Sequence, residues 1–152
     1  MTIRTFELNN THAGAISILH QQCFIDYWSD KSISEIISMP GTSGFFVGLN
    51  RELPQGFILF GIAVDEVEIL SIGVVPSARK KGLGTKLLQA TIEMGKKSGG
   101  KKLFLEVARN NKVARIFYEK VGFVIIGERP DYYKTISGKI DAITYEFDIH
   151  SA

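Results

Sequence analysis

Three apolar segments with very short connections restrict the fold of this chain more than any other feature. They are "GFFVGLN" (residues 44–50), "QGFILFGIAV" (55–64) and "EVEILSIGVV" (66–75). Only the turns "RELP" and "DE", the second of which overlaps the start of the third segment at Glu66, separate them. A helical crossover does not fit into gaps of that length. The segments are therefore predicted to be neighbouring antiparallel strands.

After residue 75 the connections become long and take on helical periodicity. The chain is predicted to continue as a helix over 82–100, a buried strand over 101–108, a helix over 111–123, and strands over 123–129 and 140–150. A helix joins the strand that ends at Val75 to the strand that starts near Lys102, so these two should run parallel. The predicted fold class is α/β: a mixed, mostly antiparallel sheet with helices on both faces.

Helical spacing also predicts where the helices begin and which side they bury. The N-terminal part reads as a strand over 2–8 and helices over 11–24 and 27–39. Thr11 is the expected N-cap of the first helix, and Ser32 with Glu35 is the expected capping box of the second. The last helix is expected to face inward with Val113, Ile116, Phe117 and Val121.

Composition is that of an ordinary soluble domain, with 45% apolar and 22% charged residues and a formal net charge of +2. That charge gives no support to nucleic-acid binding, for which a strongly basic domain is expected. Cys23 is the only cysteine, and no signal peptide or membrane span is recognisable. We therefore expect one cytoplasmic domain over 1–152, a monomer or weak dimer without nucleic-acid or membrane partners.

A basic, glycine-rich turn, "RKKGLG", lies between the third apolar strand and the following helix. The first N–H groups of a helix lack intrahelical partners, and together with the helix dipole they attract anions. The turn therefore predicts a phosphate or pyrophosphate site. The spacing fits neither the Walker A motif nor the dinucleotide fingerprint, which requires a third glycine. The candidate binding residues are Arg79, Lys80, Lys81, Gly82, Leu83, Gly84 and Thr85.

This turn, after the strand end "IGVVP", resembles the pyrophosphate loop of the GNAT family of acetyl-coenzyme A-dependent N-acetyltransferases. The segment "LEVARNNKVARIFYEKVGF" (105–123) is similar to the second cofactor segment of that family. "YWSDKSI", "GERPDYY" and "DAITYEF" resemble the RimI-type ribosomal-protein alanine N-acetyltransferases within it. The resemblance implies a GNAT-like sheet with a splayed parallel strand pair, and acetyl-CoA as co-substrate. It also implies main-chain pairing of the pantetheine arm with Ile72, Gly73 and Val74, with the Val74 N–H polarising the thioester carbonyl.

Two side chains are candidates for the proton transfers of acetyl transfer. Glu106 lies in an otherwise apolar strand, where burial would make its carboxylate a better base, acting directly or through a water. The alternative for Glu106 is a solvated or lysine-paired strand residue. Tyr118 is the candidate acid toward the coenzyme A thiolate, and Asn111, two helical turns earlier, is expected to cap the helix and hold the pantetheine arm. A plain N-cap and a half-buried aromatic are the alternatives.

The sequence restricts the acceptor less than the co-substrate. Trp28, Tyr132 and Tyr133 are candidates for binding it, although packing is nearly as good an explanation for each. Cys23 is expected in the core, and the three histidines lack metal-ligand spacing, so no metal site is predicted. The expected acceptor is the α-amine of a protein N-terminus, such as that of a ribosomal protein. The alternatives are a small amine (polyamine, amino acid or antibiotic) or a non-catalytic coenzyme A-binding sensor.

Overall fold

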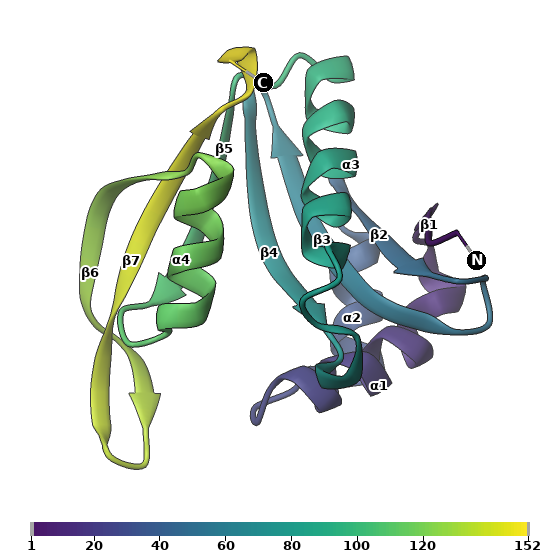
Figure 1. The fold of residues 1–152 in the computed structure, drawn as a ribbon, viewed down its shortest axis with the longest axis horizontal. Coiled ribbons are helices and arrows are strands. Elements are labelled where there is room, and N and C mark those ends of the chain that lie inside the picture. The colour runs from purple at the N-terminus through teal and green to yellow at the C-terminus, as the bar shows by residue number, and fades with distance from the viewer. Residues whose placement is uncertain (1, 152) are drawn as a thin grey trace.

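The structure is a computed structural model that describes residues 2–151, and its centre is a seven-stranded sheet (Figure 1). The strand order is β1-β2-β3-β4-β5-β7-β6, and every neighbouring pair is antiparallel except β4 and β5. The predicted mixed, mostly antiparallel sheet is confirmed. Its strands are β1 (Arg4–Glu7), β2 (Thr42–Gly48), β3 (Pro54–Ala63), β4 (Glu66–Val74), β5 (Lys102–Ala108), β6 (Val124–Thr135) and β7 (Gly138–Asp148).

Helices cover both faces of the sheet. In the view of Figure 1, α3 and α4 lie in front of the sheet, and α1 and α2 lie behind it. Short 3-10 turns occur at Asn10–His12, Pro76–Ala78 and Ile149–Ser151. The α-helices are α1 (Ala13–Cys23), α2 (Asp30–Ser38), α3 (Leu83–Lys97) and α4 (Lys112–Val121).

Strand β3 is buried on both faces, which explains its continuous run of apolar residues. Phe57, Ile58, Leu59 and Phe60 are all 0% exposed. Alternate side chains of a strand point to opposite faces, so this run supplies the core beneath α1 and the core beneath α3 together. The residues packed around it from α3 are Leu83, Leu87, Leu88 and Ile92.

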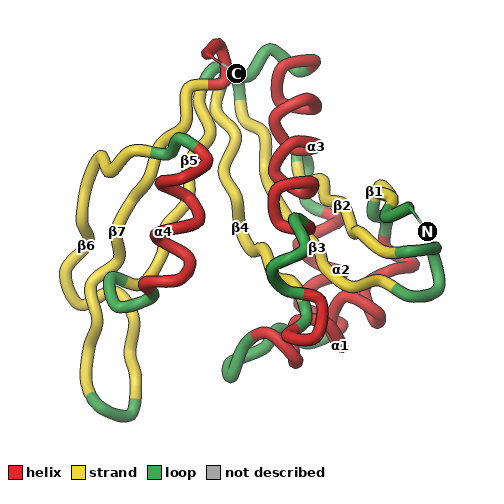
Figure 2. The backbone as a smooth tube through the Cα atoms, viewed as in Figure 1, coloured by secondary structure: helices red, strands yellow, loops and turns green. Residues whose placement is uncertain are grey.

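The parallel strands β4 and β5 pair only over their first three residues and then separate. Glu66, Val67 and Glu68 pair with Lys102, Leu103 and Phe104, and no further pair is formed. Beyond this point β4 contains an extra residue, because Phe60 pairs with Ile69 while Leu59 pairs with Ser71. The bulge at Leu70 bends β4 where the two strands diverge. The tube in Figure 2 shows the resulting V-shaped opening of the sheet.

Two predicted helix caps are wrong, and one predicted helix face is wrong at two of its four positions. The cap of helix α2 lies three residues before the predicted one, since the Ser29 hydroxyl, not that of Ser32, accepts the capping bond from the Ser32 N–H at 3.1 Å. Asn9 rather than Thr11 caps the turn that leads into α1. In α4, Val113 and Ile116 are 82% and 67% exposed. The buried side of α4 is centred about one residue further along, on Tyr118, Phe117 and Val121, which pack against the core.

The last two strands extend beyond their predicted ends to form a hairpin. The predicted segment 123–129 continues to Thr135, through Pro130, and turns at Gly138, whose φ is +129°. Most residues of this extension are exposed on both faces, so it carries no apolar alternation that could reveal a strand. Figure 1 shows the hairpin projecting past the rest of the sheet.

The core under α3 provides a test of the packing. Leu87→Ala removes a side chain that is 0% exposed, and we expect it to lower the free energy of unfolding by about 2–5 kcal/mol. The control, Gln89→Ala, changes an exposed position of the same helix and should stay within about 0.5 kcal/mol of the wild type. Urea denaturation followed by circular dichroism measures both, and equal losses would contradict the described packing.

Candidate active site

A cleft of about 390 Å³ opens where β4 and β5 separate. Its walls come from the two strands, from α1 and the loop after it, from α4, and from the β6–β7 hairpin. Six of the residues predicted from the sequence meet here although they are distant along the chain. They are Trp28, Ile72, Glu106, Asn111, Tyr118 and Tyr133.

The edge of β4 that faces the opening has main-chain groups without a strand partner. The Val75 N–H donates to the Gln55 carbonyl of the adjoining chain at 2.9 Å. In an antiparallel pair such bonds occur at every second residue, so the main-chain groups of Gly73 also face β3. The main-chain groups of Val74 and Ile72 point away from β3, toward the opening between β4 and β5. A free strand edge of this kind can pair with an extended amide-containing ligand.

Gly73 allows α1 to pack closely under this edge. A Cβ atom at position 73 would lie 2.9 Å from the Cys23 Sγ and 3.0 Å from the Phe57 ring. Cys23 packs against the core, and burial raises the pKa of its thiol. The cysteine therefore occupies the place predicted for it.

The turn into α3 has the geometry expected of an anion site. Lys80 and Gly82 adopt left-handed backbone angles, with φ of +63° and +79°. Gly82 caps α3 without a side-chain hydrogen bond, and no acidic residue lies in the first turn. The N–H groups of Leu83, Gly84 and Thr85 are therefore left for an external acceptor.

Two contacts hold this turn against the rest of the cleft. The Arg79 Nε donates to the Val74 carbonyl at 3.0 Å, which ties the turn to the free edge of β4. A Cβ at Gly84 would lie 3.1 Å from the Phe117 ring, so glycine lets α3 approach α4. The exposed side chains of Lys80 and Lys81 add positive charge beside the helix start.

Glu106 projects from β5 into the cleft and is 24% exposed. Its Oε2 accepts the Thr144 hydroxyl at 3.2 Å and forms an ion pair with the Arg129 Nε at 3.1 Å. The surroundings are thus more polar than the apolar strand sequence suggested, because β6 and β7 supply both partners from distant parts of the chain. Among the hydrogen bonds of the described residues, none engages the second carboxylate oxygen, Oε1.

Tyr118 lines the cleft from α4, where its ring lies beside those of Phe123 and Tyr145, and it is 7% exposed. Burial, and next the charge of Tyr133, raises the pKa of its hydroxyl, so the group carries its proton at neutral pH. Within residues 2–151 no hydrogen bond to this hydroxyl is formed. Asn111 caps α4 as predicted, since its side chain accepts the Ala114 N–H at 3.2 Å.

The two hairpin tyrosines have different environments. Tyr133 lines the cleft, whereas Tyr132 is 50% exposed outside it, with the two rings edge to face at 5.1 Å. The Arg129 guanidinium lies 5.0 Å from the centre of the Tyr132 ring. Pro130, Asp131 and Tyr132 form a bulge in β6, because Arg129 pairs with Ala142 while Tyr133 pairs with Ile140.

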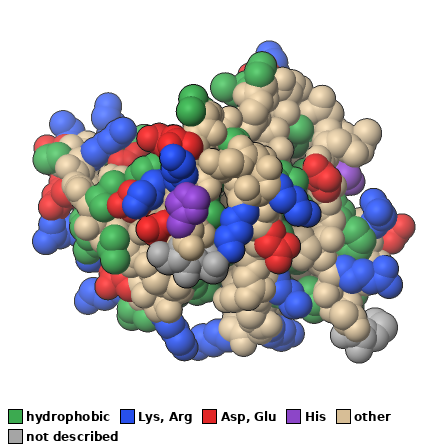
Figure 3. Space-filling model, turned by 90° about the horizontal axis from the view of Figure 1, so that it is seen from above, with side chains coloured by type: hydrophobic (Ala, Val, Ile, Leu, Met, Phe, Trp, Pro, Cys, Tyr) green, Lys and Arg blue, Asp and Glu red, His purple; other side chains and the backbone are tan. Residues whose placement is uncertain are grey.

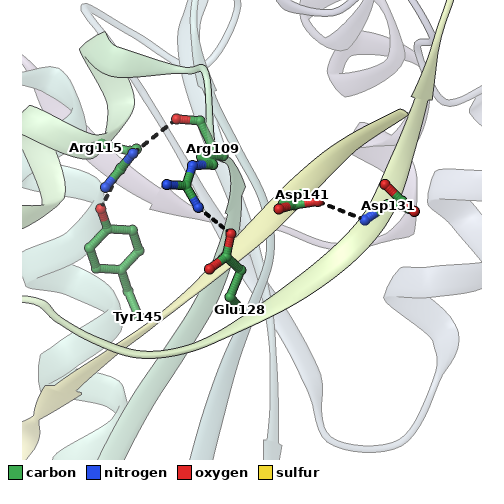
Figure 4. Close-up of polar contacts among 6 residues, drawn as sticks. All are labelled: Arg109, Arg115, Glu128, Asp131, Asp141 and Tyr145. Atoms are coloured by element: carbon green, nitrogen blue, oxygen red, sulfur yellow. Dashed lines mark hydrogen bonds and ion pairs between the residues drawn. The ribbon is translucent and has the colours of Figure 1, made fainter. Parts of the chain in front are cut away.

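Polar contacts stabilise this bulge and the base of the hairpin (Figure 4). The Asp131 N–H donates to the Asp141 carboxylate at 2.8 Å, and this bond lowers the pKa of Asp141. Arg109 forms an ion pair with Glu128. Beside it the Arg115 Nε donates to the Tyr145 hydroxyl at 3.0 Å. The wall that carries Glu106 is therefore braced from both hairpin strands.

His20, which was not predicted from the sequence as a site residue, lines the cleft as well. It is 3% exposed and stacks on Trp28, with ring centres 4.8 Å apart. Its Nδ1 accepts the Trp28 N–H at 3.0 Å, and its Nε2 lies 3.2 Å from the Ser71 hydroxyl. Burial lowers the pKa of the imidazole, so the ring is neutral at pH 7. Its position at the end of α1, one helical turn before Cys23, is the only sequence signal for its burial.

The described part of the chain offers no cluster of metal ligands. No group of three or more His, Cys, Asp or Glu side chains within residues 2–151 could hold a metal ion. In the face shown in Figure 3, Lys and Arg side chains are interspersed with Asp and Glu. Among the described helices, none has the length and apolarity needed to cross a membrane.

Comparison with known proteins finds close likenesses over nearly the whole chain. The Acetyltransferase (GNAT) family model matches residues 14–123. The chain is 36% identical over 141 residues, 90% of each protein, to the [ribosomal protein bS18]-alanine N-acetyltransferase of Escherichia coli (strain K12). The crystal structure of the ribosomal-protein-S18-alanine N-acetyltransferase from Escherichia coli has a TM-score of 0.90 at 28% identity, covering 97% of this chain and 94% of that one. Arabidopsis thaliana NAA60 in complex with acetyl-CoA shares the fold, with a TM-score of 0.85 at 16% identity over 98% and 99% of the chains.

The buried His20 predicts a dependence of stability on pH. The imidazole has its ordinary pKa of 6.5 in the unfolded chain and a lower one in the fold. Its stabilising effect is therefore complete above about pH 6.5 and decreases as the pH falls below that value, by at most about 1.4 kcal/mol per pH unit. The free energy of unfolding of the wild type should fall toward that of His20→Gln between pH 7.5 and 5.5. A difference that stays constant over this range would contradict the prediction.

Proposed function

Because this chain belongs to the acetyltransferase (GNAT) family and is an acetyl-CoA-dependent N-acetyltransferase, we propose that its acceptor is the α-amine of a protein N-terminus, in particular that of a ribosomal protein. The relative of 36% identity is a [ribosomal protein bS18]-alanine N-acetyltransferase, and the two proteins align over 90% of their lengths. The observation that carries the proposal is the cleft between β4 and β5. It is lined on one side by the free edge of β4 and on the other sides by the loop that carries Trp28 and by the β6–β7 hairpin.

The co-substrate is proposed to lie along the free edge of β4. The pyrophosphate would accept hydrogen bonds from the N–H groups at the start of α3, and Arg79, Lys80 and Lys81 would contribute positive charge. The outward main-chain groups of Ile72 and Val74 would pair with the pantetheine arm. The Val74 N–H would then polarise the thioester carbonyl, and Asn111 at the start of α4 would hold the arm from the other side.

Glu106 and Tyr118 are proposed to carry the proton transfers. Glu106 takes a proton from the acceptor ammonium through Oε1, the oxygen not engaged by Arg129 and Thr144. The freed amine nitrogen forms its bond to the acetyl carbon as the carbon–sulfur bond breaks. Tyr118 donates its proton to the departing thiolate, a role that suits a phenol kept protonated by burial. The nitrogen then loses its second proton on becoming an amide, and this proton restores the Tyr118 hydroxyl, while Glu106 releases the first proton to solvent. Holding both substrates in line would supply much of the rate.

The acceptor end of the cleft favours a peptide over a polyamine. A polyamine site would be a closed, acidic pocket, whereas here the open side is flanked by the exposed Tyr132 and the cationic Arg129. Trp28 and Tyr133 would contact the first residues of the acceptor from the two sides of the cleft. A small-amine acetyltransferase and a coenzyme A-binding sensor are the alternatives that the experiments below would reveal.

Thiol release from acetyl-CoA tests the acceptor class. We expect turnover with peptides that begin with Ala or Ser, including the N-terminal sequence of ribosomal protein S18, and little with polyamines or free amino acids. Turnover limited to small amines would overturn the peptide proposal. Tight coenzyme A binding without turnover of any acceptor would indicate a sensor.

Tyr118→Phe tests the proposed acid. It removes only the hydroxyl and keeps the packed ring, so kcat should fall on the order of 10²-fold. Calorimetric affinity for coenzyme A should stay near the wild-type value. Unchanged kcat would exclude Tyr118 from the chemistry.

Glu106→Gln tests the proposed base with an isosteric side chain. We expect kcat to fall by on the order of 10²-fold or more, with little change in unfolding free energy. Glu146→Gln, which affects only the partly exposed pair of Glu146 with Lys102, serves as a matched control. Equal activity of the two variants would contradict the role of Glu106.

A further inference from the structure

Ser71 and Glu106 project from the same face of the sheet, on the two strands that border the cleft. Val67 of β4 is paired with Leu103 of β5 and lies against α3, where a Cβ at Gly95 would be 3.2 Å from it. Leu103 and Leu105 therefore face α3 and α4, and Glu106 faces the side of α1 and α2. Ser71, beyond the bulge, contacts His20 of α1 and so faces that side too.

The hydrogen bonds of His20 determine the direction in which the Ser71 hydroxyl can donate. The Nδ1 of His20 accepts the Trp28 N–H, so the proton of the neutral ring is on Nε2. The Nε2–H therefore donates to the Ser71 oxygen, 3.2 Å away. The single hydroxyl proton of Ser71 is then left to donate elsewhere, and Ser71 lines the cleft.

This arrangement also excludes His20 as a base for the acceptor amine. Nδ1 is engaged by a main-chain N–H and Nε2 already carries a proton, so neither nitrogen can accept one through Ser71. Aromatic contacts with Phe24, Trp28 and Phe57, whose ring centres lie 4.5–5.6 Å away, hold the imidazole in place. His20 is thus a positioning residue, which connects the loop carrying Trp28 to the strand carrying Ser71.

We propose that the Ser71 hydroxyl, oriented by His20, donates a hydrogen bond to the carbonyl oxygen next to the acceptor α-amine. The inference rests on the proposed function and names the chemical feature that the site would select. An acceptor amine presented to Glu106 enters on the face from which Ser71 projects. The amine nitrogen needs its lone pair to attack the thioester, so it cannot accept a hydrogen bond from Ser71. The nearest hydrogen-bond acceptor on a peptide is then the carbonyl oxygen of its first residue. Amines flanked by an amide carbonyl are therefore selected over polyamines, which have none.

A single-atom change in the acceptor tests this bond. The probe is a peptide beginning with Ala whose first amide oxygen is replaced by sulfur, a poorer hydrogen-bond acceptor, compared with the unmodified peptide. The wild type should prefer the unmodified peptide by about 3- to 10-fold in kcat/KM, the worth of one hydrogen bond. Ser71→Ala should lose a similar factor on the unmodified peptide and show no preference. The exposed Ser98→Ala is the control and should retain the wild-type preference.

Variants of His20 separate positioning from packing. His20→Gln keeps a donor near the Nε2 position and should retain part of the preference, whereas His20→Phe keeps ring volume without a donor and should abolish it. The ring nitrogens can also be observed directly by ¹⁵N NMR of the wild type, which should show a proton on Nε2 and none on Nδ1.

The outcomes distinguish this inference from the proposed function. Turnover of peptides with an unchanged preference in Ser71→Ala, or a proton on Nδ1 of His20, would overturn the inference alone. Wild-type protein that turns over no peptide would overturn the proposed function and the inference with it.

Discussion

The functional architecture depends on the loss of pairing between β4 and β5 after three residues. A parallel pair that continued would satisfy its main-chain groups internally and leave no space between the strands. The extra residue at Leu70 bends β4 while its pairing with β3 continues in a shifted register, so the strand separates from β5 without losing its other neighbour. The same bulge sets which main-chain groups of Ile72 and Val74 face the opening. One irregularity thus creates the cleft and supplies its hydrogen-bonding edge.

The two faces of the sheet carry different parts of the proposed chemistry, and the two walls of the cleft are stabilised by separate contacts. On the α3 and α4 side are the anion-binding turn and the buried hydroxyl of Tyr118, and on the α1 side are Ser71, His20 and Glu106. The β4 wall is held by Arg79 and by the packing of α1 under Gly73, whereas the β5 wall is braced by the hairpin contacts of Thr144 and Arg129. Two substrates that enter from opposite faces would meet only in the opening between the strands.

Sequence reasoning predicted the sheet well because each strand is either an apolar run or lies at one end of a predicted helix. Short turns required β2, β3 and β4 to be antiparallel, and a helical connection required β5 to be parallel to β4. The hairpin beyond residue 129 was not predicted, since exposed strands lose alternation. Val113 and Ile116 were wrongly placed on the inward face of α4, which borders an open cleft rather than a closed core. The anion-binding turn could be predicted because its residues are contiguous in the sequence. The partners of Glu106 and the contact between His20 and Ser71 could not, because they connect segments far apart in the chain.

The buried imidazole shows why the acceptor side is built from such distant segments. The Ser17 hydroxyl of α1 donates to the Trp28 carbonyl at 2.9 Å, but holding Trp28 at a fixed distance from β4 also requires a contact that reaches the strand. His20 supplies that contact, because its ring accepts a hydrogen bond from the Trp28 N–H in the loop and donates one to the Ser71 hydroxyl in β4. Protonation would place a second donor opposite the Trp28 N–H and break the connection, so burial that keeps the ring neutral also preserves the shape of the acceptor side. Stability of the fold and geometry of the acceptor site are therefore coupled through one side chain.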